Sequence, residues 1–289
     1  MISLPFSVRE AGPAGACGGP RRPGRAWRRD PLRRRSVPAP RAGPPPGRAV
    51  PASVFRGRIR RGMRDKEEIM DLKTAMERRH AVRQYRGLPI PPETAAELER
   101  EIAACNAEGG LHIQLALEEP EAFRGPLAHY GSFRNVRDYL CLAGPQGPEL
   151  EEKIGYYGQR LVLRAFQLGL DSCWAALTFR KRKCRCDLRP GEKLVCAVAL
   201  GYGKDHGVPH KSKAPEAVCR WPGDAPPDWF RAGAEAALLA PTALGQQKFL
   251  LTLEGDRVRA EALKGPYSQI DLGIVKYQFE LAAGRKPWI

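Results

Sequence analysis

The spacing of apolar residues predicts a folded body that begins near residue 70 and contains five helices. The helices are expected at about residues 71–79, 92–109, 149–170, 228–239 and 269–284. Asp71 is suited to cap the first of them, and Gly169 and Gly284 are suited to end the third and the last. In the last helix one face gathers apolar residues, which predicts an amphipathic helix; these residues are Ile270, Ile274, Tyr277 and Leu281.

Other apolar runs have the pattern of strands. Leu111–Leu117 alternates strictly, which is typical of a half-buried strand. Tyr139–Ala143 is short and apolar, and Lys193–Gly203 is almost continuously apolar, so helices should cover the sheet on both faces. Gly255 and Asp256 are expected to join two further strands, Lys248–Glu254 and Arg257–Leu263, in a hairpin. Asp171–Trp174 is expected to be a turn after the third helix.

The order of elements suggests an internal duplication. A helix followed by a strand at residues 92–117 recurs at residues 228–254. The separation is far longer than any solenoid period. We therefore predict two half-units, at about residues 70–215 and 216–289, that form one body.

Residues 1–62 differ sharply in composition from the rest. They hold 15 arginines, no lysine and only two acids, Glu10 and Asp30, so they account for most of the net charge of +16. Their Pro, Gly and Arg content predicts a disordered tail; a targeting peptide and a mis-assigned start before Met63 or Met70 are alternatives. The tail could also bind nucleic acid. The nearly balanced body, residues 70–289, gives no electrostatic reason to expect such binding there.

The eight cysteines show no paired spacing, and several lie in apolar runs. This pattern is typical of reduced thiols and favours a cytoplasmic protein. Cys184 and Cys186 lie in a basic segment, KRKCRC, but a zinc site would need a second such pair or nearby histidines, so no metal is expected. No apolar run has the roughly 18–20 residues that a bilayer requires, so no membrane partner is expected either.

The densest chemical signal is the basic stretch Met76–Tyr85, MERRHAVRQY. It contains Arg78, Arg79 and Arg83, with His80 between them. Guanidinium groups at this density suit a phosphate or a carboxylate. The alternative is a solvated basic helix end, which the helix dipole also favours.

Several motifs in order resemble the FMN-dependent nitroreductase family. RRHAVRQY resembles its opening RRSxRxF/Y signature, and GYYGQRLVLRAFQLGLDSCWAAL resembles the helix and turn that meet the flavin. LRPGEKLVCAVALGYG with HKSK resembles its last core strand and basic tail, and APTALGQQKF resembles its PSAxNxQPW loop. The ending from Asp271 to Glu280 resembles the branch in which two half-units are fused in one chain. The resemblance covers roughly residues 70–289 and implies an α+β fold with a mixed sheet, helices on both faces and a pseudo-dimer within one chain.

The resemblance also implies roles for individual residues. Arg79, His80 and Arg83 would hold the FMN phosphate and ribityl chain, together with Lys211 and Lys213. No side chain would be catalytic. The remaining implied flavin contacts are the segment beside the ring, Trp174, Ala175, Ala176 and Leu177, and the loop from the second half-unit, Pro241, Thr242 and Ala243.

The implied activity is hydride transfer from NADH or NADPH, through FMN, to a small electron acceptor such as a nitroaromatic or a quinone. The chain would be a monomer or a homodimer. Four positions depart from the family pattern: Ala81, Gln159, Ala176 and Gly245. The alternative is therefore a non-catalytic binding or scaffold protein with this fold and with weakened or lost FMN binding.

Overall fold

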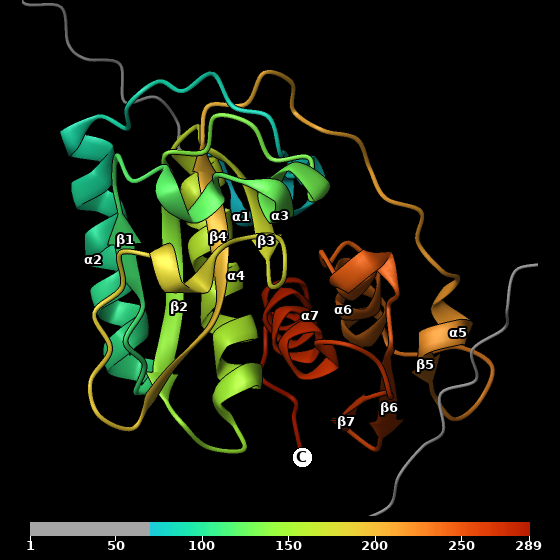
Figure 1. Cartoon of the computed structure of the whole chain (residues 1–289). Helices are drawn as coiled ribbons and strands as arrows, with labels where there is room; N and C mark the ends of the chain where they lie inside the picture. Colours follow the sequence, from blue (N-terminus) through green and yellow to red (C-terminus); the bar gives the residue numbers. More distant parts are fainter. Residues whose placement is uncertain (1–69) are drawn as a thin grey trace, which may run out of the picture. The chain divides into compact units, whose positions relative to one another are not determined.

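The computed structural model describes residues 70–289, and these residues form an α+β fold (Figure 1). The predictions made for residues 1–62 lie outside this range. The longer helices are α1 (Leu72–Arg78), α2 (Pro92–Gly109), α4 (Leu150–Gln167), α6 (Asp228–Leu238) and α7 (Ser268–Ala283). Shorter turns are η1 (Glu121–Phe123), α3 (Pro126–Tyr130), η2 (Lys181–Lys183), α5 (Pro215–Val218) and η3 (Ala243–Gly245). No helix in the described part of the chain is long and apolar enough to span a bilayer.

The strands form two sheets rather than the single mixed sheet expected. The larger sheet has the order β1-β2-β4-β3 with antiparallel neighbours throughout; its strands are Gln114–Ala116, Asp138–Pro145, Glu192–Gly201 and Asp171–Ala175 in that order. In the smaller sheet β5 (Cys219–Arg220) runs parallel to β6 (Phe249–Glu254), which pairs antiparallel with β7 (Arg257–Ala262). The second sheet is separate because β5, β6 and β7 pair with no strand of the larger sheet.

Both faces of the larger sheet are covered, as predicted. Successive side chains of a strand point to opposite faces. On β2, Leu140 and Leu142 join the core beneath α2 and α4, whereas Tyr139 and Cys141 join a second core on the other face. That second core includes Phe123 and is covered by short helices and loops of residues 121–136.

Helix α7 lies between α4 and α6 and is buried almost all round. The predicted helix is therefore present, but the prediction that it is amphipathic is wrong. The neighbours of α7 occupy both its sides, which leaves little of it for solvent. Its crossing with α4 is very close. A Cβ atom added at Gly155 would lie 2.0 Å from the Ile270 carbonyl oxygen, and one added at Gly273 would lie 1.9 Å from the Glu152 carbonyl oxygen. Two glycines therefore allow the two backbones to touch.

Most element predictions are confirmed, including the Asp71 cap, whose carboxylate accepts from the backbone N–H groups of Lys73 and Thr74. Two are wrong. Residues 171–175 form strand β3 instead of a turn, because each of them pairs with a residue of β4 between Ala197 and Gly201. The strand expected at 111–117 is reduced to β1, at the edge of the sheet. The internal duplication stays a prediction: α6 and β6 follow one another as α2 and β1 do, but the two sheets differ in strand number and direction.

Candidate functional site

Arg79 follows the last residue of α1 and carries a charge that the fold leaves unmatched. Its side chain is only 4% exposed, and its Nε atom has no hydrogen-bond partner. Burial lowers the pKa of this guanidinium to about 10. Within residues 70–289 no carboxylate forms an ion pair with it. Because a buried, unpaired charge is costly, this position is suited to an anionic ligand.

Strand β3, which pairs with residues 81 and 82, carries a second unsatisfied polar group. Ala81 forms a bridge with Ser172, and the Val82 N–H donates to the Ser172 carbonyl over 3.0 Å. The Ser172 hydroxyl is buried and has no partner. Burial raises the pKa of the adjacent Cys173 thiol, and the positive charges of Arg83 and Arg79 oppose that rise. Both guanidinium groups therefore lie near the Cys173 thiol of β3.

Residues 203–210 close over the basic stretch. Asp171 holds this segment through the Gly203 N–H, at 3.0 Å, and through His206 Nδ1, at 3.4 Å. Gly207 has a φ of +70°, and a Cβ atom there would lie 2.9 Å from the Ala81 carbonyl oxygen. A side chain at position 207 would therefore push the segment away from residues 80–81.

His80 connects the basic stretch to the second half of the chain. Burial lowers the pKa of His80, and the charges of Arg79 and His210 lower it further. His210 therefore lies close to His80. Its Nε2 atom is 3.0 Å from the Leu238 carbonyl oxygen, at the end of α6.

Buried Gln247 organises the loop that follows α6. Its side-chain amide donates to the Leu238 carbonyl over 2.9 Å, and its backbone N–H donates to the Thr242 hydroxyl over 3.1 Å. Its side-chain oxygen accepts from the Lys213 N–H over 2.7 Å, and its carbonyl accepts from Lys213 Nζ over 2.9 Å. The predicted residues Thr242 and Lys213 are thus held together by a residue that sequence reasoning did not select.

Asp271, in the first turn of α7, fixes the same loop from its other side. Its carboxylate accepts from the Ala243 N–H over 2.9 Å and from Gln246 Nε2 over 2.8 Å. Burial raises the pKa of Asp271 to about 6, although both hydrogen bonds oppose the rise.

This raised pKa predicts a pH dependence of stability. The folded chain binds the Asp271 proton more tightly than the unfolded chain, so this group stabilises the fold at low pH and the contribution is lost as the pH rises through about 6. Relative to Asp271→Asn, the wild-type free energy of unfolding should fall by up to about 3 kcal/mol between about pH 4 and about pH 7. Urea denaturation across this range measures the difference. Asp224→Asn, at an exposed position, should follow the wild type; identical pH profiles for all three proteins would contradict the assignment.

The predicted residues do not all converge. Arg79, His80 and Arg83 lie together and connect through His210 and Gln247 to Thr242 and Lys213, while Lys211 lies exposed on the same segment. Trp174 is half-buried and packs against the core between the sheet and α4. A Cβ atom at Gly158 would meet its ring at 2.5 Å, and its Nε1 lies 3.4 Å from Gln159 Oε1.

The segment after Trp174 returns toward the surface. Ala175 is buried in the core on the opposite face of the sheet. Ala176 is half-buried, and Leu177 is 69% exposed. In the other predicted loop Pro241 and Ala243 are half-buried, and Leu244 is 95% exposed. Each loop that the resemblance assigns to the flavin ring therefore presents an exposed leucine.

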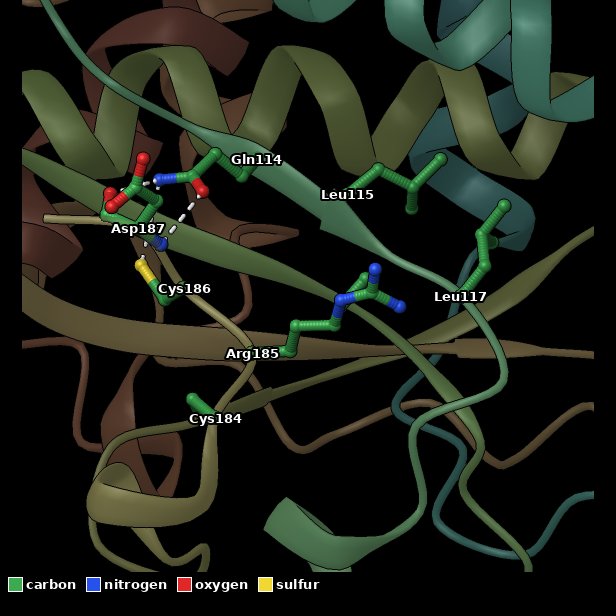
Figure 2. Close-up of a pocket in the computed structure, with 8 residues that line it drawn as sticks. Gln114, Leu115, Leu117, Cys184, Arg185, Cys186 and Asp187 are labelled. Carbon is green, nitrogen blue, oxygen red and sulfur yellow. Dashed lines mark hydrogen bonds between the residues drawn. The ribbon is translucent and has the colours of Figure 1, made fainter.

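A cavity of about 570 Å³ lies elsewhere, between β1 and residues 184–187 (Figure 2). Sequence reasoning missed it. It also missed roles for Ser172, His210, Gln247 and Asp271. Gln247 and Asp271 lay inside matched motifs, so a signal for them existed, whereas nothing in the sequence distinguished Ser172 from any other polar residue.

Solved structures share this fold. The "putative nitroreductase" of Thermotoga maritima MSB8 aligns with a TM-score of 0.55 at 18% identity, over 75% of this chain and 85% of that chain. A structure described as a putative nitroreductase in complex with FMN, from Desulfovibrio desulfuricans, aligns over 55% of this chain and 99% of that one, with a TM-score of 0.44 and 13% identity. The first similarity defines a nitroreductase-type α+β fold.

The family described as "Putative TM nitroreductase" matches residues 71–283. The chain belongs to this family, and its membership supports an oxidoreductase role. No curated protein matches the sequence.

Proposed function

We propose that this chain is an FMN-dependent oxidoreductase that uses NADH or NADPH to reduce a small acceptor such as a nitroaromatic or a quinone. The observation that carries the proposal is the buried guanidinium of Arg79, which has no carboxylate partner in the described chain and an Nε atom without a hydrogen bond. A buried cation without a partner is suited to bind a ligand that carries an anionic group.

The residues present fit the phosphate end of FMN. Arg79 and Arg83 supply guanidinium donors, and His80 lies between them in sequence. Charge-assisted hydrogen bonds to a phosphate contribute about 1.5–3 kcal/mol each. Lys211 is exposed and free to turn toward the same group, whereas Lys213 Nζ already donates to the Gln247 carbonyl. We therefore assign the phosphate to Arg79, Arg83 and Lys211, and a loop-holding role to Lys213.

Ser172 supplies a hydroxyl that the basic stretch lacks. The family signature has serine where this chain has Ala81, and Ala81 is the residue that bridges Ser172. The Ser172 hydroxyl is buried beside it and lacks a partner. A hydroxyl from the neighbouring strand would thus take the place of the missing one and face the ribityl chain.

The remaining residues would orient the ring. When bound, FMN accepts a hydride from a reduced nicotinamide and passes reducing equivalents to an acceptor, which is chemistry that the cofactor itself supplies. Leu177 and Leu244 offer apolar surface from the two loops assigned to the ring. Asp271 and Gln247 hold the second loop in position. No acid or base side chain is required of the protein.

Anaerobic reduction tests the activity directly. FMN-loaded protein should lose its flavin absorbance when NADH or NADPH is added, and should regain it when a quinone or a nitroaromatic follows, because the two substrates use one site in turn. The control is the same protein with oxidised nicotinamide. Tight FMN binding without reduction by either nicotinamide would support the alternative, a binding protein that has kept the fold and lost the reaction.

A further inference from the structure

Three cysteines lie close together at the second core, on the face of the larger sheet that is opposite α4, away from the proposed flavin site. Cys141, on β2, is fully buried and belongs to the second core. Cys184 and Cys186, on the loop after η2, pack against that core and are half-buried. The Arg185 carbonyl, between the two loop cysteines, lies against the Cys141 thiol. All three cysteines are free thiols.

The loop that carries Cys186 is held in place by Gln114 of the edge strand β1. Gln114 lies directly opposite Cys141 in the pairing of β1 with β2. Its side-chain amide donates to the Asp187 carbonyl over 2.7 Å and to Cys186 Sγ over 3.5 Å. Its side-chain oxygen accepts from the Asp187 N–H over 2.9 Å. Gln114 therefore fixes Cys186 above the buried Cys141.

A second hydrogen bond fixes the loop between the two loop cysteines. The Arg185 N–H donates to the Tyr139 hydroxyl over 2.9 Å, and Tyr139 lies two residues before Cys141 on β2. The Arg185 carbonyl is 3.6 Å from Cys141 Sγ. The thiols are thus positioned by the fold rather than by a free loop.

The cavity of about 570 Å³ opens beside these thiols. Its lining includes Cys184, Arg185 and Cys186 on one side, and on the other Leu115 of β1 and Leu117, which follows β1 (Figure 2). In Figure 2 the Arg185 side chain extends away from Cys186, toward Leu115 and Leu117. The site therefore offers a cation, apolar surface and a partly exposed thiol, which together suit a small anionic molecule that reacts with sulfur.

We propose that Cys186 and Cys141 form a thiol–disulfide exchange site whose substrate is a low-molecular-weight disulfide bearing carboxylates. Cys186 is the attacking thiol, and Cys141 resolves the intermediate. Arg185 binds a carboxylate of the substrate. This role is separate from the proposed flavin chemistry, because no residue is shared between the two sites.

The exchange balances in two steps. The Cys186 thiolate attacks one sulfur of the substrate, a bond forms to that sulfur, and the other half leaves as a thiolate that takes up a proton. Cys141 then gives up its proton and attacks Cys186 Sγ, which expels the second half as a thiol. Two protein thiols are oxidised to a disulfide, and one substrate disulfide is reduced to two thiols.

The electrostatics around Cys186 agree with its role as nucleophile. The neighbouring Cys141 thiol lowers the pKa of Cys186, although burial and the carboxylates of Glu192 and Asp187 oppose this effect. The pKa of Cys141 is raised by its contacts with the other two thiols and by burial. A metal is a weaker explanation, because residues 70–289 contain no group of His, Cys, Asp or Glu arranged to hold one.

Oxidised glutathione tests the proposal. Fully reduced protein incubated with it should lose two hydrogens in intact mass, release two molecules of glutathione and keep none, and peptide mapping should show a Cys141–Cys186 disulfide. Cys141→Ala should stop at a glutathione adduct on Cys186, and Cys186→Ser should give neither product. Cys184→Ser should behave as the wild type, and Arg185→Ala should slow the first step about tenfold, as expected if it removes one charged contact worth about 1.4 kcal/mol.

Three results would overturn the assignment. One is a disulfide that maps to another cysteine pair. Another is an adduct that persists on the wild-type protein, because Cys141 would then not resolve it. The last is oxidation of Cys186→Ser at the wild-type rate. Circular dichroism of each variant separates these results from loss of the fold.

Discussion

Replacement of Arg79 by methionine should weaken FMN binding and, at the same time, raise the stability of the FMN-free protein. The guanidinium is buried with an unpartnered Nε and no carboxylate among residues 70–289, so it costs stability until an anion arrives. Its loss removes charge-assisted hydrogen bonds worth about 1.5–3 kcal/mol each, which corresponds to a rise in Kd of about tenfold to more than a hundredfold. Exchange of a buried charge for an apolar side chain should raise the free energy of unfolding by about 1–4 kcal/mol.

Flavin fluorescence titration and urea denaturation measure the two effects separately. Arg78→Met is the matched control, because Arg78 is the preceding residue, has the same side chain and is exposed. It should leave both quantities nearly unchanged. An unchanged Kd for Arg79→Met would show that the phosphate lies elsewhere. A less stable FMN-free Arg79→Met protein would show that Arg79 stabilises the fold itself and is not placed there for an anionic ligand.

Alanine at Gly273 should destabilise the protein strongly. Its Cβ atom would lie 1.9 Å from the Glu152 carbonyl oxygen, so α4 and α7 would have to move apart. Overpacking of this kind costs about 1–3 kcal/mol or more, and contact with rigid backbone places this case at the upper end. The gain of about 1 kcal/mol in helix propensity offsets part of the cost. We expect a net loss of about 2 kcal/mol in urea denaturation.

Gly273→Ala should also weaken FMN binding. Helix α7 carries Asp271, which holds the loop containing Ala243 and Gln246. A shift of α7 would therefore loosen that loop and weaken FMN binding as well. Gly147→Ala is the control, since a Cβ atom there meets nothing within 4 Å. If Gly273→Ala is as stable as Gly147→Ala, the backbones of α4 and α7 do not touch at Gly273.

Much of the fold could be predicted because its signals are local. Asp71 caps α1, Gly284 ends α7 with a positive φ, and Gly255 begins the hairpin turn, each through the conformation of one residue and its neighbours. The errors have a different origin. Whether residues 171–175 form a turn or a strand depends on pairing with β4, and whether α7 is amphipathic depends on what packs against its second face.

The candidate site divides in the same way. Arg79 and Arg83 were identifiable from their density and order in the chain, and the structure brings them together beside β3. The sequence could not show whether Trp174 contacts the flavin ring or packs inside the protein. Only its contact with Gly158 of α4 shows that its indole packs against the core. The thiols of Cys141 and Cys186 are far apart in sequence and meet only through the β1–β2 pairing and the loop above it.

If the buried cation of Arg79 belongs to an FMN site, the full chain should bind the flavin tightly. The most direct test is the absorption spectrum of the full chain after incubation with excess FMN and removal of the free cofactor by desalting. We expect a yellow protein with the absorption bands of protein-bound flavin and one FMN per chain, and a colourless Arg79→Met variant. A colourless wild-type protein under the same conditions would contradict this expectation.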